Sequence, residues 1–157
     1  MPYSDKIPEL QADLARARSE HYRLVWLAGG TDSERSSILR ALAETEDGVF
    51  VEVGKKLSTA LLDVPAPLRT ASVEECFTAC LGGSSCPVTC LNHLEILFDP
   101  SLRINPVTLV KRASRHALIV AAWPGLTKDG QLTFGTPDHP AYMEPSKQDI
   151  ESLVHFL

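Results

Sequence analysis

A glycine-rich turn between an apolar run and an amphipathic run carries the residues best suited to chemistry in this chain. In residues 24–42, LVWLAGGTDSERSSILRAL, the spacing approximates the phosphate-binding pattern G-x-x-x-x-G-K-[ST]. Glycines there let backbone N–H groups face phosphate oxygens, the lysine contacts the terminal phosphates, and the hydroxyl holds Mg²⁺. We therefore expect ATP and Mg²⁺ as cofactors, with Ser36 as a magnesium ligand. The expected nucleotide-binding residues are Gly29, Gly30, Thr31, Asp32, Ser33, Arg35, Ser36 and Ser37.

Two signature positions of this pattern are altered. Glu34 stands where the second glycine would be, and Arg35 replaces the lysine. Arg35 keeps a cation that can pair with phosphate, although its forked guanidinium is bulkier than an ammonium. Glu34 adds a carboxylate, which repels a triphosphate. Two alternatives stay open: a nucleotide-binding loop, or a strand, turn and helix of the same shape without nucleotide.

A polar strand end further along the chain is the second candidate site. The run VTCLNHLEIL resembles a Walker B segment, in which an aspartate holds the magnesium shell and an acid orients or activates water. Asn92 occupies the aspartate position as the second expected magnesium ligand, and Glu95 is the candidate catalytic acid. Because asparagine is neutral, this substitution argues against robust hydrolysis. The alternative is a polar strand end at which His93 and Glu95 face solvent or pair with basic residues.

A basic cluster lies at the C-terminal end of a helix predicted at residues 106–114. It consists of Lys111, Arg112, Arg115 and His116. In one interpretation these cations stabilise the helix C-terminus. In the other, Arg115 is an arginine finger for the nucleotide of a neighbouring subunit, which would require a homo-oligomer, or a phosphate contact to DNA.

The four cysteines fall within fifteen residues, in the spacing C-x3-C-x5-C-x3-C from Cys76 to Cys90. The gap between the two pairs is much shorter than the roughly 12–20 residues that usually separate zinc-binding pairs. Cys76 and Cys80 also have helical spacing, and Cys90 lies in an apolar strand-like run. We therefore expect free thiols, with neither a zinc site nor a disulfide.

Length and composition are those of one ordinary folded domain. The chain has 157 residues, of which 44% are hydrophobic, and a net charge of −5. Its longest apolar stretch, residues 117–123, is far shorter than the about 20 residues of a membrane-spanning helix, and residues 1–23 lack the apolar segment of a secretory signal. We expect a cytoplasmic protein without a membrane partner, in which any contact with DNA would need a local basic patch.

Apolar strands alternate with helices along most of the chain. An N-terminal helix is predicted at residues 8–23, and a core at residues 24–125 contains strands at 24–28, 49–53, 88–91 and 117–123, the third continuing through NHLEILF, residues 92–98. Helices are predicted between them at 36–45, 56–62, 72–81 and 106–114. This alternation predicts an α/β fold with three α/β/α layers and a mostly parallel sheet, like that of P-loop NTPases. Residues 126–157 are predicted to form an extension with a turn, a short strand, an irregular segment and a C-terminal helix at 147–157.

The stretch LNHLEILFDPSLRINPVTLVKRASRHALIVAAWPG, residues 91–125, resembles the central signature of the BrxF family, small P-loop proteins of type 3 BREX bacteriophage-defence systems. The matching motifs are EILFDP at 95–100, a proline-initiated helix at 106–113, Ser-Arg at 114–115 and Trp-Pro-Gly at 123–125. The block VGKKLSTALLDVPAPLR, residues 53–69, is also similar to the family's segment between its loop and its Walker B strand.

The resemblance implies an AAA-like P-loop ATPase domain that acts as an accessory of a multi-protein phage restriction system. Its partners would be a large ATPase, a DNA methyltransferase, a helicase and a phosphatase-like protein, and DNA would be reached only through them. By position, Gly29, Gly30, Arg35 and Ser36 would contact phosphates, and Asn92 and Glu95 would stand at the Walker B site. Two functions stay open: an ATP-binding component, with weak hydrolysis, whose nucleotide state controls assembly of the complex, or a scaffold that binds a larger ATPase without using nucleotide itself.

Overall fold

The computed structural model describes residues 5–82, 86–150 and 153–157. Its main sheet has five parallel strands in the order β2-β3-β4-β1-β7. Trp26 at the middle of β1 pairs with Ala121 on one side and with Val154 on the other. These strands are β1 Leu24–Ala28, β2 Val49–Glu52, β3 Thr89–Asn92, β4 Ile119–Ala122 and β7 Leu153–Phe156. A small antiparallel pair, β5 Leu126–Lys128 and β6 Gln131–Thr133, follows β4.

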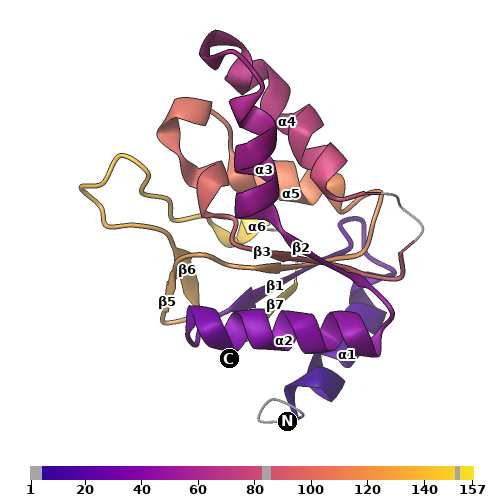
Figure 1. Ribbon diagram of the computed structural model, residues 1–157. Coiled ribbons are helices and arrows are strands. Elements are labelled where there is room, and N and C mark those ends of the chain that lie inside the picture. Colours follow the sequence, from indigo (N-terminus) through magenta and orange to yellow (C-terminus); the bar gives the residue numbers. More distant parts are fainter. Residues whose placement is uncertain (1–4, 83–85, 151–152) are drawn as a thin grey trace.

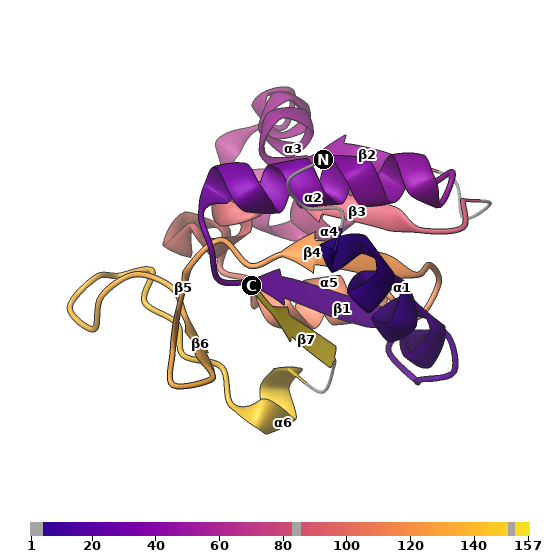
Figure 2. The ribbon, with the colours of Figure 1, turned by 90° about the horizontal axis from the view of Figure 1, so that it is seen from below.

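Helices cover both faces of the main sheet (Figures 1 and 2). One face carries α1 Lys6–Ala17 and α2 Asp32–Thr45. The other carries α3 Val53–Leu62, α4 Arg69–Cys80, α5 Pro106–Ala113 and α6 Lys147–Ile150, together with the 3₁₀ turns η1 Ala66–Leu68, η2 Glu95–Phe98 and η3 Pro100–Leu102. In the described part of the chain, no helix combines the length and the apolar character needed to cross a bilayer. The predicted α/β fold, with a mostly parallel sheet between helical layers, is confirmed.

Two apolar clusters, one on each face, hold these layers together. All of β1 is buried, as expected for a central strand of a parallel sheet. Because side chains alternate along a strand, Val25 and Leu27 pack with α1 and α2, whereas Trp26 packs on the opposite face. There the Trp26 ring meets Trp123 edge to face, with 5.4 Å between ring centroids. The two faces together bury enough apolar surface to fix α2 and β3, which position the candidate site.

The predicted C-terminal helix at 147–157 is wrong. Helix α6 ends at Ile150, and residues 153–156 form β7, which pairs with β1. Residues 151–152 lie outside the described ranges. The physical reason is that β1 would otherwise present unpaired main-chain groups along a fully buried strand, a cost that pairing with β7 removes. Strand β5, within residues predicted as a turn, was also not anticipated.

Several element boundaries also differ from those predicted. The N-terminal helix spans Lys6–Ala17 rather than 8–23. Helix α4 spans Arg69–Cys80 rather than 72–81, so that Ser72 lies inside the helix. The third strand stops at Asn92 because His93 adopts a left-handed conformation, with φ of 56°. The helix after the glycine turn begins at Asp32 rather than at the predicted residue 36. The cause of this shift lies in the candidate site.

Candidate functional site

The glycine turn and the predicted Walker B residues meet at the carboxyl edge of the sheet. Because β1, β2 and β3 are parallel, the turn after β1, Glu52 at the end of β2 and Asn92 at the end of β3 share this edge. The chain leaves β1 toward α2 on one face and leaves β3 toward α5 on the other. In open α/β sheets, ligands bind in the crevice at such a change of side. The fold therefore collects the predicted residues where a ligand site is expected.

The glycine loop, defined as Gly29, Gly30 and Thr31, is the whole connection between β1 and α2. Gly29 and Gly30 have φ values of 84° and 63°, which favour glycine. A Cβ on Gly29 would lie 3.3 Å from the carbonyl oxygen of Leu157, and one on Gly30 would lie 3.1 Å from the Leu157 side chain. Glycine is thus required at both positions by conformation and by the close approach of Leu157, without any need for a phosphate.

Helix α2 begins at Asp32, four residues before its predicted start, because Thr31 and Glu34 form a capping box. The backbone N–H of Glu34 donates to Thr31 Oγ1 at 3.1 Å, and the backbone N–H of Thr31 donates to Glu34 Oε1 at 3.2 Å. Such N-terminal amides are the groups that a bound phosphate uses. The carboxylate of Glu34 therefore accepts a hydrogen bond from a loop amide that the motif offers to a bound phosphate.

Arg35 is turned back onto the glycine loop. Its side chain is buried, with 7% of the residue exposed, and Nη1 donates to the carbonyl oxygens of Gly29 at 2.8 Å and of Gly30 at 3.1 Å. In the phosphate-binding pattern the cation at this position contacts the terminal phosphates. In this chain it stabilises the loop itself.

Ser36 and Asn92, the two predicted magnesium ligands, are in direct contact. Asn92 is buried and donates from Nδ2 to Ser36 Oγ at 2.8 Å and to Glu52 Oε1 at 3.0 Å. Because a carboxylate only accepts hydrogen bonds, Glu52 fixes the amide with its NH₂ group toward Ser36. Asn92 Oδ1, the atom that would bind a cation, is buried without a hydrogen-bond partner in the described structure. The fold brings Ser36 and Asn92 together, but the Asn92 atom that faces Ser36 is Nδ2, a hydrogen-bond donor.

His93, adjacent to Asn92, lies between two carboxylates. Nδ1 is hydrogen-bonded to Glu52 Oε2, and Nε2 lies 3.2 Å from Asp32 Oδ2. The hydrogen bond with Glu52 raises the pKa of His93, burial opposes this, and Asp32 raises it further. Burial pushes the pKa of Glu52 upward, but hydrogen bonds from His93 and Asn92 outweigh it and lower that pKa. A histidine with a raised pKa thus lies between two acids at the place where the motif predicts Mg²⁺.

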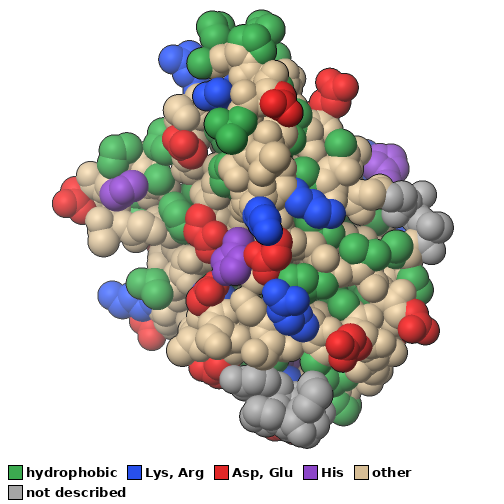
Figure 3. Space-filling view, in the orientation of Figure 1, with side chains coloured by type: hydrophobic (Ala, Val, Ile, Leu, Met, Phe, Trp, Pro, Cys, Tyr) green, Lys and Arg blue, Asp and Glu red, His purple; other side chains and the backbone are tan. Residues whose placement is uncertain are grey.

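The charges around the loop do not suit a triphosphate. Acidic, basic and histidine side chains gather on the face in front of α2 and α3 (Figure 3). The acids nearest the start of α2 are Asp32, Glu34 and Glu52. The cations of this cluster are engaged by the protein: Arg35 by the loop, His93 by two acids, and Arg40 by Glu52 at 3.7 Å. The residues present therefore do not fit a magnesium–triphosphate group in this conformation.

Glu95 and Arg115, the predicted catalytic residues, lie outside this cluster. Glu95 is exposed at the start of η2, one turn beyond His93. Arg115 precedes β4 and so lies at the opposite, amino edge of the sheet, where its carbonyl oxygen accepts a hydrogen bond from Arg23 Nη2 at 2.8 Å. Because the sheet separates Arg115 from the glycine loop, it is not placed to act on a ligand of its own molecule.

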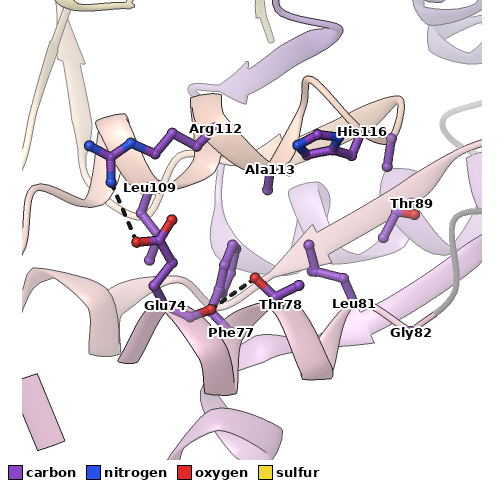
Figure 4. Close-up of a pocket in the computed structure, with 11 residues that line it drawn as sticks. Glu74, Phe77, Thr78, Leu81, Gly82, Thr89, Leu109, Arg112, Ala113 and His116 are labelled. Carbon is purple, nitrogen blue, oxygen red and sulfur yellow. Dashed lines mark hydrogen bonds and ion pairs between the residues drawn. The ribbon is translucent and has the colours of Figure 1, made fainter. Parts of the chain in front are cut away.

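Lys111 and Arg112 of the basic cluster are bound to nearby protein groups, and His116 lines a pocket beside them. Lys111 Nζ donates to the carbonyl oxygen of Asp149 at 2.9 Å, and Arg112 pairs with Glu74 at 3.4 Å. This ion pair joins α5 to α4 beside a pocket of about 470 Å³, whose wall includes Phe77 and Leu109 (Figure 4). Lys111 and Arg112 also occupy the last turn of α5, which favours cations.

The cysteines are unpaired. Cys90 is buried in β3, where burial raises its pKa to about 12, and Cys76, Cys80 and Cys86 are half-buried. Among the described residues, no group of three or more His, Cys, Asp or Glu side chains is arranged to hold a metal ion.

Comparison of the chain with models of protein families gave no match, and a search of curated proteins found no significant relative. The expected resemblance to BrxF proteins, based on the motifs in residues 53–69 and 91–125, stays a prediction from the sequence.

Proposed function

We propose that this protein is a non-catalytic adaptor that has a P-loop-like fold but does not use ATP at its glycine loop. The observation that carries this proposal is the capping box of α2, together with the hydrogen bonds of Arg35 to the loop carbonyls. The capping box engages the backbone amides of Thr31 and Glu34, and the Arg35 guanidinium donates to the loop carbonyls instead of to a phosphate. The fold then serves to position surfaces for other proteins.

The energetic cost of binding phosphate here supports this interpretation. A phosphate at the loop would have to displace the Glu34 carboxylate from Thr31 and draw the Arg35 guanidinium away from two carbonyls. Hydrogen bonds to charged groups contribute about 1.5–3 kcal/mol each. Losing the two hydrogen bonds of Arg35 costs at least about 3 kcal/mol, which weakens the affinity for phosphate roughly a hundredfold. Repulsion by Glu34, if it remained nearby, would add to this cost.

A rigid apolar tip supports a role in binding protein. The turn between α3 and α4, at the top of Figures 1 and 3, exposes Leu62 by 75% and Leu68 by 56%. Arg69 Nε fixes this turn by donating to the carbonyl oxygens of Leu61 at 3.0 Å and Val64 at 3.1 Å. A turn whose backbone is already held in one conformation loses less entropy on binding than a flexible one. The apolar tip, residues 62–68, is therefore a preorganised docking feature.

The resemblance of residues 91–125 to BrxF proteins supports a role for the proposed adaptor in a BREX-type phage-defence complex, where a larger ATPase would supply nucleotide chemistry. Within this segment, Phe98 and Trp123 pack edge to face at 5.4 Å, so the motif residues around EILFDP and Trp-Pro-Gly form one structural unit.

The test is co-purification of the tagged protein with the neighbouring components of such a system, with and without magnesium and ATP. An adaptor recovers the same partner in equal amount under both conditions. Recovery that requires ATP, and that Ser36→Ala abolishes, would instead support nucleotide-controlled assembly.

A further inference from the structure

The last strand of the sheet has a free edge. β7 pairs with β1 on one side and, within the described residues, with no strand on the other. The backbone N–H of Leu157 donates to the carbonyl oxygen of Ala28 at 2.8 Å. Because main-chain groups alternate in direction along a strand, the N–H and C=O groups of Val154 and Phe156 point away from β1. They are placed to pair with another strand.

Strand β7 carries neither the lysine nor the proline that often protects an edge strand. Natural edge strands carry lysine, proline, bulges or inward charges, whereas β7 reads Leu-Val-His-Phe. Its one ionisable side chain, His155, is directed to α1, with Nδ1 2.9 Å from Asp13 Oδ2. At the opposite edge, β2 ends in Glu52, and the guanidinium of Arg40 lies 4.2 Å from the ring centroid of Phe50. The two edges thus differ in protection.

A groove of about 320 Å³ runs beside the free edge. Its lining comes from β6, α6 and β7, and includes Leu132, Ile150, Val154 and Phe156. Phe156 is 45% exposed. Figure 2 shows β7 at the border of the sheet with α6 and β6 beside it. Apolar side chains of an added strand would therefore find a groove on this face.

We propose that β7 binds an extended, apolar segment of a partner protein as an added strand. This proposal rests on the proposed adaptor function, which requires a site for a partner. Unpaired N–H and C=O groups at strand spacing are matched by another extended main chain, and the groove accepts its alternate side chains. A helix or a folded surface over the edge would bury these groups unpaired, at a cost.

The test starts with a selection from a random dodecapeptide display library on the full chain. Selected peptides are then titrated by fluorescence anisotropy against the wild type, Val154→Pro and Val154→Thr. Proline removes the outward N–H without removing a hydrogen bond to β1, and threonine keeps the N–H and the β-branched shape. We expect peptides rich in alternating apolar residues that bind the wild type and Val154→Thr equally and bind Val154→Pro at least about tenfold more weakly.

Hydrogen exchange on the wild type gives a second readout that does not depend on how well Val154→Pro folds. The amides of Val154 and Phe156 should become protected when a selected peptide is bound, while the amides of β2 should not change. Failure to select any peptide, equal binding to Val154→Pro in its folded state, or protection elsewhere would overturn the proposal. Dimerisation that Val154→Pro abolishes would assign the edge to a second copy and would also overturn it. None of these outcomes depends on ATP, so they are distinct from a failure of the adaptor proposal at the glycine loop.

Discussion

Glu34 and Arg35 determine what the glycine loop can do. Both depart from the phosphate-binding pattern, and both have structural partners inside the loop. The sequence predicted the departures but not their consequence, although Thr31 and Glu34 also match the capping-box pattern [ST]-x-x-E. Two patterns overlap on the same residues, and the local one is satisfied because its partners are only three residues apart. His93 was harder to foresee, since its contacts with Glu52 and Asp32 depend on how β2, β3 and α2 meet.

Removing the capping hydroxyl should destabilise the protein. Thr31→Ala leaves the N–H of Glu34 without its acceptor, so we expect the free energy of unfolding in urea to fall by about 1 kcal/mol. The control is Ser33→Ala in the same exposed turn, which should change it by less than about 0.5 kcal/mol. Equal values for the two variants would argue that the cap does not hold the loop.

The His93 cluster should make stability depend on pH. The pKa of His93 is raised above 6.5 in the folded state, so its contribution is complete below that value and is lost as pH rises through the folded pKa. The pKa of Glu52 is lowered below 4.5, so its contribution is present above that value and is lost on acidification. Their joint contribution to stability is therefore largest between pH 4.5 and pH 6.5, the ordinary pKa values of the two groups.

His93→Asn, which tolerates the positive φ, should consequently destabilise the protein more at about pH 5.5 than at about pH 9. Urea unfolding of the wild type and the variant at both pH values measures this difference. The same loss at both would show that the imidazolium contributes nothing beyond its shape.

The order and type of most elements were predictable from sequence, whereas the last element was not. Continuous apolar strands and the stops between them predicted a parallel sheet, and Ile38, Leu39 and Leu42 are buried on α2 as expected. The C-terminal segment misled because Ile150, Leu153, Val154 and Leu157 have helical spacing. Pairing with β1 overrides that local pattern, as tertiary contacts often do in strands.

The apolar tip should matter for binding and not for folding. Leu62→Ser combined with Leu68→Ser removes two exposed side chains, so the free energy of unfolding should change by less than about 0.5 kcal/mol per site. Capture of the defence-system partner by the tagged protein should nevertheless fall. Asp63→Ser on the same tip is the matched control and should capture normally. Undiminished capture by the double variant would exclude the tip as a docking feature.

At the scale of the whole molecule, the surfaces suited to contact are well separated. The carboxyl edge holds a self-paired cluster of charges, the amino edge carries Arg115, the apolar tip projects from the α3–α4 side, and β7 leaves a free strand edge. Separate surfaces that face several directions suit the proposed adaptor function. The resemblance to BrxF proteins suggested the pathway from sequence alone, but the state of the loop depends on side-chain contacts that no motif specifies.

We propose that the side chains of Glu34 and Arg35 already occupy the groups through which the glycine loop would bind phosphate. Calorimetric titration of magnesium and ATP into the wild-type protein measures this binding. We expect no saturable heat at ATP concentrations up to about 1 mM, at which a weak binding site would still be detected. Saturable one-site binding that is lost in Ser36→Ala would contradict it.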